Sequence, residues 1–546
     1  MNKNFDTTGY VREFKQIFAF LQSKARLKLN DMRQILRKYP KDGKGIFSRE
    51  ELVTAYRYFV DNKLIQADQN LLDKIKMKPS RTISGVVPVT VLTKPWPCPG
   101  KCIFCPSDVR MPKSYLADEP GAQRALRNEF DPYLQVYNRL LAFHNIGHTT
   151  EKVELIVLGG TWSVYPLNYR IWFIKRCFQA MNDFGVDDRR LGTETEQVVS
   201  WENLFHEQIK NESAKSRNVG LVLETRPDFI TKDEIVNLRH LGATKIQIGI
   251  QSLDNEILRA NGRGHTVDDS VRAVAMLRSA GFKIHVHWMP NLYGATVVGD
   301  KADYLQIWQK IAPDELKIYP TSIISGTKLA EYYDGGKYHP YNYPELVDLL
   351  KYCFVNTPRY CRLTRVVRDI PAPDIVAGNK FSNLRQIIDQ ELIKDGKRCQ
   401  CIRCREVRLY EFDENQIKLN TQKYETPTTI EYFLSFDTNV DDRLLGFLRL
   451  SLPKNMNSII DELACTAIIR EVHIYGQSID IGDRQVGKAQ HLGLGTKLIA
   501  KARELAHDAG FNEVAVISAI GTRGYYEKLG FIKGKLYMHD QQAAGL

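Results

Sequence analysis

Between about residues 88 and 320, short apolar runs alternate with helical patterns, and this alternation constrains the fold more than any other feature. Most runs are nearly continuous in apolar residues, as in strands buried on both faces of a parallel sheet. Helical segments such as DDSVRAVAMLRSAG lie between several of them, with Gly281 at the stop. The pattern predicts an α/β fold with an incomplete (β/α)6 barrel, because two clear strands are missing for a complete one. The predicted strands are 88–95, 153–160, 218–228, 245–252, 283–290 and 315–321.

In a barrel of this kind the chemistry takes place at the C-terminal ends of the strands. The predicted strands end in glycines and in polar side chains that could contact a ligand there. These candidates are Gly159, Gly160, Glu224, Arg226, Gln251 and His287.

The flanking segments differ from the barrel in pattern, so we expect four parts. A small basic helical region covers 1–78, and Ser48 is the predicted N-cap of one of its helices. The barrel covers 79–385, and a charged connector with cysteines covers 386–410. After it, TIEYFLSFDT, DDRLLGFLRLSL and CTAIIREVHIYG predict antiparallel strands, followed by a helix and a further strand. The last part, 411–546, is therefore expected to be a compact α+β domain.

The bulk composition is that of a globular protein. Hydrophobic residues make up 43% of the 546 residues, and no apolar run is long enough to span a bilayer. The N-terminal stretch MNKNFDTTGYVREF lacks the apolar core of a signal peptide. We therefore expect a cytoplasmic protein without a membrane partner, whose ten cysteines are reduced.

Three cysteines follow the first predicted strand in the stretch CPGKCIFCP. Cys98, Cys102 and Cys105 have C-x3-C-x2-C spacing, and the neighbouring prolines and glycine permit tight turns. Three thiolates can hold three irons of a 4Fe-4S cluster and leave the fourth open. The open iron can chelate S-adenosylmethionine, whose reductive cleavage gives a 5′-deoxyadenosyl radical. The alternative is a zinc site that lacks one ligand.

A second motif, QHLGLG, opens the predicted helix of the last domain. Glycines at 493 and 495 let the backbone approach a ligand, and the free N–H groups of a helix start can hold a pyrophosphate. Two adjacent tyrosines, Tyr525 and Tyr526, follow the next strand. One interpretation of both tyrosines is packing in the core.

The connector carries a second cysteine cluster, KRCQCIRCRE. Cys399, Cys401 and Cys404 could bind a structural zinc ion, which requires a fourth ligand. His339, Cys353 and Cys361 are the candidates, and the sequence does not choose among them. The alternative is a group of reduced thiols without metal.

The net charge of +12 is concentrated near the N-terminus. The segment from Lys24 to Glu50 contains nine basic and three acidic residues, a pattern that attracts phosphate backbones. The alternative is a solvated helix face. The candidate nucleic-acid contacts are Lys24, Arg26, Lys28, Arg33, Arg37 and Lys38.

These motifs resemble those of known families. The three-cysteine loop, together with the GGT triplet after the next strand, resembles the radical S-adenosylmethionine superfamily. The order strand, Q-x-x-G-x-G turn, strand and Tyr-Tyr resembles the GNAT acetyltransferases, whose ligand is acetyl-CoA. The combination is similar to the catalytic-subunit family of Elongator, from about residue 80 to 540. The stretches that carry it include KVELIVLGGTW, LETRPD, HVHWMPNLYGA, VVRDIPAPDIVAG and ISAIGTRGYYEKLGF.

The resemblance implies a tRNA-modifying enzyme that makes 5-carboxymethyluridine at the wobble position. Acetyl-CoA would supply two carbons, the deoxyadenosyl radical would abstract a hydrogen from the acetyl methyl group, and hydrolysis of the thioester would leave the carboxymethyl group. The implied partner is the anticodon stem-loop of tRNA, and Elongator-type subunits or a second copy of the chain are further candidates. The alternatives are a protein lysine acetyltransferase and a non-enzymatic RNA-binding scaffold.

Residue roles also follow from the resemblance. The catalytic residues would be Tyr526, Tyr525 and Lys152, and Lys152 would also bind acetyl-CoA. The remaining cofactor-binding residues would be Gly159, Gly160, Thr161, Gln251, Glu471, Val472, His473, Ile474, Gln490, Gly493, Leu494, Gly495 and Thr496. One departure is that Ser107 and Asp108 follow Pro106, where the family usually has a glycine pair, which affects the shape of the loop.

Overall fold

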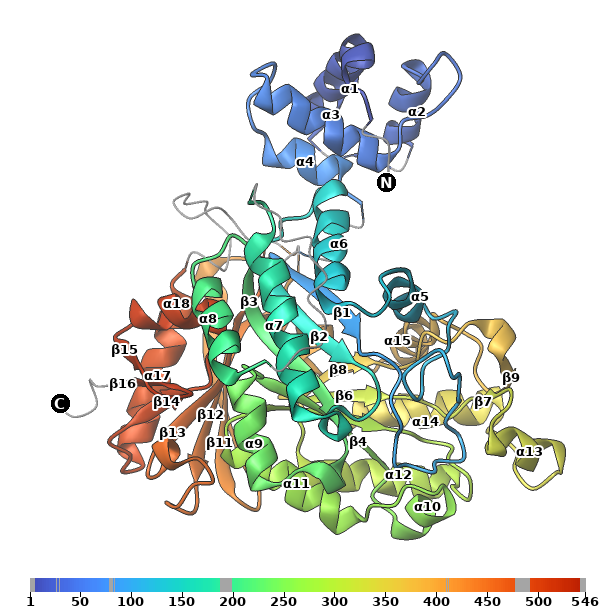
Figure 1. The fold of residues 1–546 in the computed structure, drawn as a ribbon, viewed down its shortest axis with the longest axis vertical. Helices are drawn as coiled ribbons and strands as arrows, with labels where there is room; N and C mark the ends of the chain where they lie inside the picture. The colour runs from blue at the N-terminus through green and yellow to red at the C-terminus, as the bar shows by residue number, and fades with distance from the viewer. Residues whose placement is uncertain are drawn as a thin grey trace.

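The fold is known from a computed structural model of the chain. The structure describes residues 5–25, 27–28, 30–77, 82, 84–186, 199–408, 410, 412–476 and 492–540. At the N-terminus, four helices form a lobe with its own apolar core (Figure 1). Ser48 and Glu51 form a capping box at the start of the third helix, as the N-cap prediction expected. The helices are α1 (Val11–Ser23), α2 (Asp31–Lys38), α3 (Arg49–Asp61) and α4 (Gln69–Ile75).

The central part is a parallel sheet that curves into an open barrel. All six predicted strands are present, as β1 (Val86–Leu92), β2 (Lys152–Leu158), β3 (Arg217–Thr225), β4 (Lys245–Gln251), β5 (Lys283–Trp288) and β6 (Glu315–Ile318). They pair in chain order, and a seventh strand, β8 (Arg362–Arg365), extends the sheet beside β6. The sequence analysis missed β8, because RLTR is short and polar. The incomplete barrel is confirmed, with seven strands in place of six.

Helices cover the convex face of this sheet and bury its outward side chains (Figure 1). Gly281 adopts φ +79° just after α11, consistent with the predicted stop. The covering helices are α6 (Pro132–Asn145), α7 (Leu167–Asp183), α8 (Trp201–Asn211), α9 (Lys232–His240), α11 (Val267–Ser279), α12 (Val297–Gln306) and α14 (Tyr343–Val355). Smaller elements are α5 (Pro120–Arg127), α10 (Asn255–Ala260), α13 (Lys328–Asp334), α15 (Leu384–Lys394), α16 (Ile402–Arg405), β7 (Ile323–Ile324) and β9 (Ile375–Ala377).

The C-terminal part is a second sheet packed on the helix α17 (Leu494–Asp508). Its strand order is β10-β11-β12-β13-β14-β16-β15, and only β13 and β14 are parallel neighbours. The strands are β10 (Ile417–Glu425), β11 (Thr429–Thr438), β12 (Leu444–Pro453), β13 (Ala467–Ile474), β14 (Val514–Val516), β15 (Phe531–Lys533) and β16 (Met538–Asp540), with α18 (Arg523–Glu527) between β14 and β15.

The second sheet docks against the N-terminal edge of the barrel strands. The Arg470 guanidinium donates to both carboxylate oxygens of Asp314, just before β6, at 2.6 and 2.8 Å. The Tyr537 hydroxyl donates to the Ala280 carbonyl at 2.6 Å, and Gly521 lies against Arg217 at the start of β3. One continuous apolar core also extends across this interface. The concave side of the barrel therefore opens at one end onto the C-terminal domain.

Candidate active site

A cavity of about 1800 Å³ runs through the concave side of the barrel into the C-terminal domain. Alternate residues of each strand line it, because successive side chains of a strand point to opposite faces. Its walls include the cysteine loop at the C-terminal strand ends and the start of α17 beyond the N-terminal ends. Both ligand sites predicted from the sequence therefore face the same cavity.

The cysteine loop after β1 is built around Gly100. A side chain there would lie 2.5 Å from Nη1 of Arg226 and 3.5–3.6 Å from the sulfurs of Cys98 and Cys102. The Gly100 N–H donates to the Cys98 sulfur at 3.4 Å, and Nη1 of Arg263 donates to the Cys102 sulfur at 3.3 Å. These donors stabilise thiolates, as metal binding requires.

Nη1 of Arg226 is buried and has no hydrogen-bond partner among the described residues. Its other nitrogens pair with Asp228 and with a carbonyl. A buried donor without a partner beside two sulfurs is suited to an anionic group on those sulfurs. The residues present therefore fit an iron–sulfur cluster. Burial, together with the nearby Cys102, raises the pKa of the Cys105 thiol to about 11, so its deprotonation depends on a bound cation.

The GGT triplet ends β2 beside this loop. Gly159 has φ +146°, and a side chain there would lie 1.8 Å from the Thr93 hydroxyl, so only glycine fits. The Thr161 hydroxyl lies 3.9 Å from the Cys98 sulfur. At the end of β4, Gln251 has φ +67° and a buried Oε1 without a partner among the described residues. Gly160, Thr161 and Gln251 all line the cavity near the cysteines.

At the other end of the cavity, Gly493 adopts φ +64° and α17 begins at Leu494. Among the described residues, no side chain caps this helix start, which leaves its first N–H groups available for an anion. A Cβ atom at position 495 would lie 2.7 Å from the Tyr525 hydroxyl oxygen, so Gly495 lets the tyrosine pack closely against the helix start. Gly493, Gly495 and Thr496 line the cavity. Gln490 lies outside the described residues.

Within the described part of the chain, the second half of β13 has a free edge beside α17. The strand pairs with β14 only from Ala467 to Ile469, and beyond that point the two strands separate. Glu471, Val472, His473 and Ile474 follow the point of separation and line the cavity. Tyr526 is 7% exposed, in the core of this sheet, whereas Tyr525 is 45% exposed. Both tyrosines line the cavity, and burial raises the pKa of each phenol.

Lys152 is the first residue of β2, and Gly159, seven residues later, directly follows the end of that strand. At about 3.3 Å per residue, this places the two roughly 20 Å apart, at opposite ends of the cavity. Burial and the neighbouring Arg217 lower the pKa of Lys152. The lysine thus belongs to the end that faces the C-terminal domain.

The sulfurs of Cys399, Cys401 and Cys404 lie within 4.8 Å of one another. No fourth Cys, His or carboxylate joins this group in the described part of the chain. Of the three predicted fourth ligands, Cys361 lies nearby, since its carbonyl accepts from the Ile402 N–H, whereas His339 is exposed. The Arg385 guanidinium donates to the sulfur of Cys404 at 3.3 Å.

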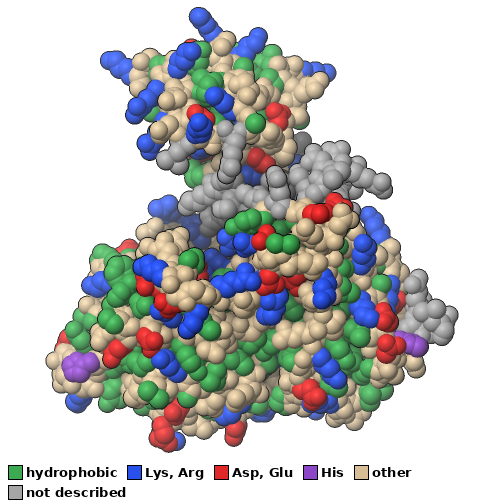
Figure 2. All heavy atoms as spheres, turned by 180° about the vertical axis from the view of Figure 1, so that it is seen from behind, with side chains coloured by type: hydrophobic (Ala, Val, Ile, Leu, Met, Phe, Trp, Pro, Cys, Tyr) green, Lys and Arg blue, Asp and Glu red, His purple; other side chains and the backbone are tan. Residues whose placement is uncertain are grey.

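The basic residues of the N-terminal lobe lie on its surface (Figure 2). Lys28, Arg33, Arg37 and Lys38 are exposed, and Lys24 packs over the Phe20 ring at 5.1 Å. Arg26 lies outside the described residues. The lobe therefore presents a cationic surface.

The sequence analysis missed Arg263 and the charged residues on the floor of the barrel. Arg263 lies in the stretch ANGRGHT, with a glycine on each side. These two glycines could have indicated that the backbone here comes close to another part of the site. Lys245, Lys283 and Glu315 begin their strands, and no local pattern distinguishes them from exposed strand ends. None of the described helices is long and apolar enough to cross a membrane.

Comparison with known proteins agrees with this geometry. Residues 98–297 match the radical SAM superfamily, and residues 313–394 match the Radical_SAM C-terminal domain. The tRNA uridine(34) acetyltransferase of Methanocaldococcus infernus is 39% identical over 485 residues, which cover 86% of this chain and 88% of that protein. Elongator complex protein 3 of Mus musculus is 34% identical over 480 residues, 84% of this chain and 85% of that protein.

The chain belongs to the Elongator complex protein 3 family. A solved structure of the same family, the archaeal Methanocaldococcus infernus Elp3 with residues 1–46 deleted, aligns with a TM-score of 0.71 and 36% identity. The alignment covers 84% of this chain and all of that one. Family membership implies that the Elp3-type barrel holds a 4Fe-4S cluster and S-adenosylmethionine.

Proposed function

We propose that this chain modifies the wobble uridine, position 34, of tRNA to 5-carboxymethyluridine, with acetyl-CoA as the two-carbon donor. The names of its relatives support the substrate and the acyl group. The observation that carries the proposal is the continuous cavity between the cysteine loop and the start of α17. A reaction that joins radical chemistry to an acetyl group needs both sites in one enclosed space.

At the barrel end, Cys98, Cys102 and Cys105 would hold the cluster, and Arg226 and Arg263 would neutralise its negative charge. Gly160, Thr161 and Gln251 would contact S-adenosylmethionine from the cavity wall, and Gly159 would set the turn that presents the first two. The bound pair supplies the 5′-deoxyadenosyl radical. The protein contributes the position of this pair, inside the cavity at the C-terminal ends of the barrel strands.

At the other end, the first turn of α17 binds the pyrophosphate of acetyl-CoA, and the free edge of β13 pairs with its pantetheine arm. Gly493, Leu494, Gly495 and Thr496 supply backbone N–H groups, and Glu471 to Ile474 supply the strand edge. Tyr526, with Tyr525 beside it, lies near the thioester, and Lys152 contributes from the barrel. This arrangement directs the acetyl group into the barrel.

We also propose that the connector binds a structural zinc ion through Cys399, Cys401 and Cys404. The spacing of the sulfurs fits three corners of a tetrahedral site. Arg385 then hydrogen-bonds to the ligating sulfurs from outside, as second-layer donors do at such sites. The zinc would fix the connector to β8.

The proposed RNA contacts are the cationic surface of the N-terminal lobe and two arginines at the edge of the cavity. Arg403 and Arg408 line the cavity and form no ion pair among the described residues. Burial and the neighbouring Arg385, Arg362 and Arg408 lower the pKa of Arg403 to about 10. An anionic phosphate would relieve this repulsion, so we infer that the anticodon stem-loop passes here.

The test uses anaerobically reconstituted protein with reductant, S-adenosylmethionine, acetyl-CoA and unmodified tRNA. Mass spectrometry of the digested tRNA should show a carboxymethyl group on uridine 34, together with 5′-deoxyadenosine. Cys102→Ala should abolish both products, because the cluster loses a ligand, while acetyl-CoA binding persists. Wild-type protein that yields neither product would contradict the proposal.

A protein lysine acetyltransferase is the competing function. Such an enzyme needs a base near the thioester to deprotonate the amine. Burial alone would raise the pKa of Glu471, but Lys283 and Arg449 lower it overall, which makes this carboxylate a weak base. The cavity in front of β13 also continues into the barrel. Acetylated peptide in the assay above, without any modified tRNA, would favour this alternative.

A further inference from the structure

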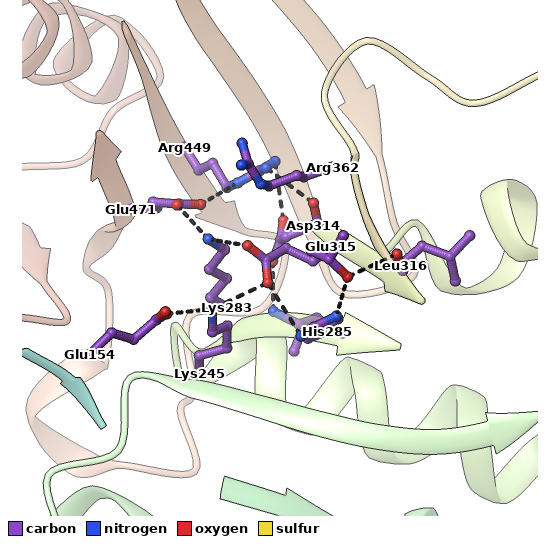
Figure 3. Close-up of polar contacts among 12 residues, drawn as sticks. Glu154, Lys245, Lys283, His285, Asp314, Glu315, Leu316, Arg362, Arg449 and Glu471 are labelled. Carbon is purple, nitrogen blue, oxygen red and sulfur yellow. Dashed lines mark hydrogen bonds and ion pairs between the residues drawn. The ribbon is translucent and has the colours of Figure 1, made fainter. Parts of the chain in front are cut away.

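A lysine from the barrel bridges the two domains at the floor of the cavity (Figure 3). The Lys283 ammonium lies 2.8 Å from a carboxylate oxygen of Glu315 on β6 and 2.5 Å from one of Glu471 on β13. Glu471 also accepts from Arg449 at 2.9 Å. Both carboxylates are held in place, so the ammonium has a fixed position.

The Lys283 ammonium lies close to the point where β13 and β14 separate. The last paired residues are Ile469 and Val516, and Glu471 is the second residue beyond them on β13. A ligand arm that pairs with the free edge of β13 would end at this gap. Lys283 contacts β13 there from the barrel side, and it lines the cavity.

We propose that Lys283 donates a hydrogen bond to the carbonyl oxygen of the acetyl thioester. This inference rests on the proposed acetyl-CoA site. An ammonium has three N–H donors, and among the described residues only two find acceptors, Glu315 and Glu471. The third N–H is available to a ligand in the cavity, and Glu315 and Glu471 act as positioning residues for it.

The contact matters most when the thioester is hydrolysed. Water adds to the carbonyl carbon, the C–S bond breaks, and the CoA sulfur takes up one of the water protons. The product is the carboxylic acid, whose proton passes to solvent. Negative charge develops on the carbonyl oxygen during this step, and a fixed cationic donor stabilises that charge.

The first test compares the binding of acetyl-CoA and CoA to the full-length protein without S-adenosylmethionine or reductant. Lys283→Met should weaken acetyl-CoA binding about tenfold, the order expected for a charged hydrogen bond. CoA binding should change less than about twofold, because CoA has no carbonyl at that point. Lys283→Arg should restore part of the lost affinity for acetyl-CoA. Lys245→Met is the matched control, since Lys245 contacts Glu154 and Glu315 but not β13.

The second test observes the thioester carbonyl directly. Infrared spectra of acetyl-CoA labelled with carbon-13 at the carbonyl should show a lower stretching frequency in the wild-type complex than in water, and Lys283→Met should reverse this change. An unchanged frequency in the wild type, or equal losses of acetyl-CoA and CoA affinity in Lys283→Met, would overturn the role of Lys283. If the wild type bound neither ligand, the acetyl-CoA site itself would be wrong.

Discussion

At the residue scale, the site depends on a few positions where the backbone leaves no room for a side chain. Gly159 is the extreme case, because its positive φ and the Thr93 hydroxyl both exclude a Cβ atom. Gly100 has a similar constraint from Arg226. Sequence alone identified both segments through their motifs, but it could not name the atoms that impose the constraint.

Gly159→Ala should destabilise the protein by about 2–5 kcal/mol, from backbone strain and overpacking against Thr93. It should also abolish S-adenosylmethionine binding, because the GGT loop must move. Gly336→Ala is the control: its φ is +71°, no atom lies within 4 Å, and only strain of about 1 kcal/mol is expected. Melting temperature and ligand binding measure the two effects. Equal destabilisation in both variants would contradict the steric argument.

At the element scale, buried ion pairs join the barrel to β12 and β13. Arg470 is fully buried and pairs with Asp314 of the barrel and with Glu431 of β11, each at 2.6 Å. Arg449 lies 3.3 Å from the same Asp314. The strands of the two sheets are therefore held in one relative position, which keeps the free edge of β13 facing the cavity.

Arg470→Met should cost about 3–5 kcal/mol, because two buried carboxylates, Asp314 and Glu431, lose their closest cationic partner. The loss should appear in denaturant unfolding of both domains together. Arg259→Met removes an exposed pair with Glu256 on α10 and should cost no more than about 1 kcal/mol. Unchanged stability of Arg470→Met would show that the ion pairs do not hold the domains together.

At the scale of the whole molecule, the chain has three regions: a cationic helical lobe, a barrel with a cysteine loop, and a sheet with a free strand edge. The cavity connects the last two, and the lobe stands apart from them above α6 (Figure 1). RNA binding by the lobe should therefore be separable from cofactor binding.

Replacing Lys28, Arg33, Arg37 and Lys38 together by Gln should weaken tRNA binding and lower the slope of its salt dependence by about 3, as expected for the loss of four phosphate contacts. Acetyl-CoA affinity should stay the same. Filter binding at several salt concentrations measures the slope. The control replaces four lysines outside the lobe by Gln: Lys351 on α14, Lys394 on α15, and the exposed Lys380 and Lys397. An unchanged slope in the lobe variant would place the RNA contacts elsewhere.

The sequence by itself determined the βα order, the cysteine loop, the GGT turn and the helix start of α17. These features depend on local patterns: apolar runs, ligand spacing and glycine positions. The N-cap of α3 was also predicted from Ser48 and the acidic residues that follow it. Only the tertiary structure decided that β8 extends the barrel and that the second sheet docks on its N-terminal edge. It also brought Lys283, Glu315 and Glu471 together, from positions up to 188 residues apart. The physical reason is that pairing of a short polar strand and of buried charges depends on partners distant in sequence, about which a local pattern carries no information.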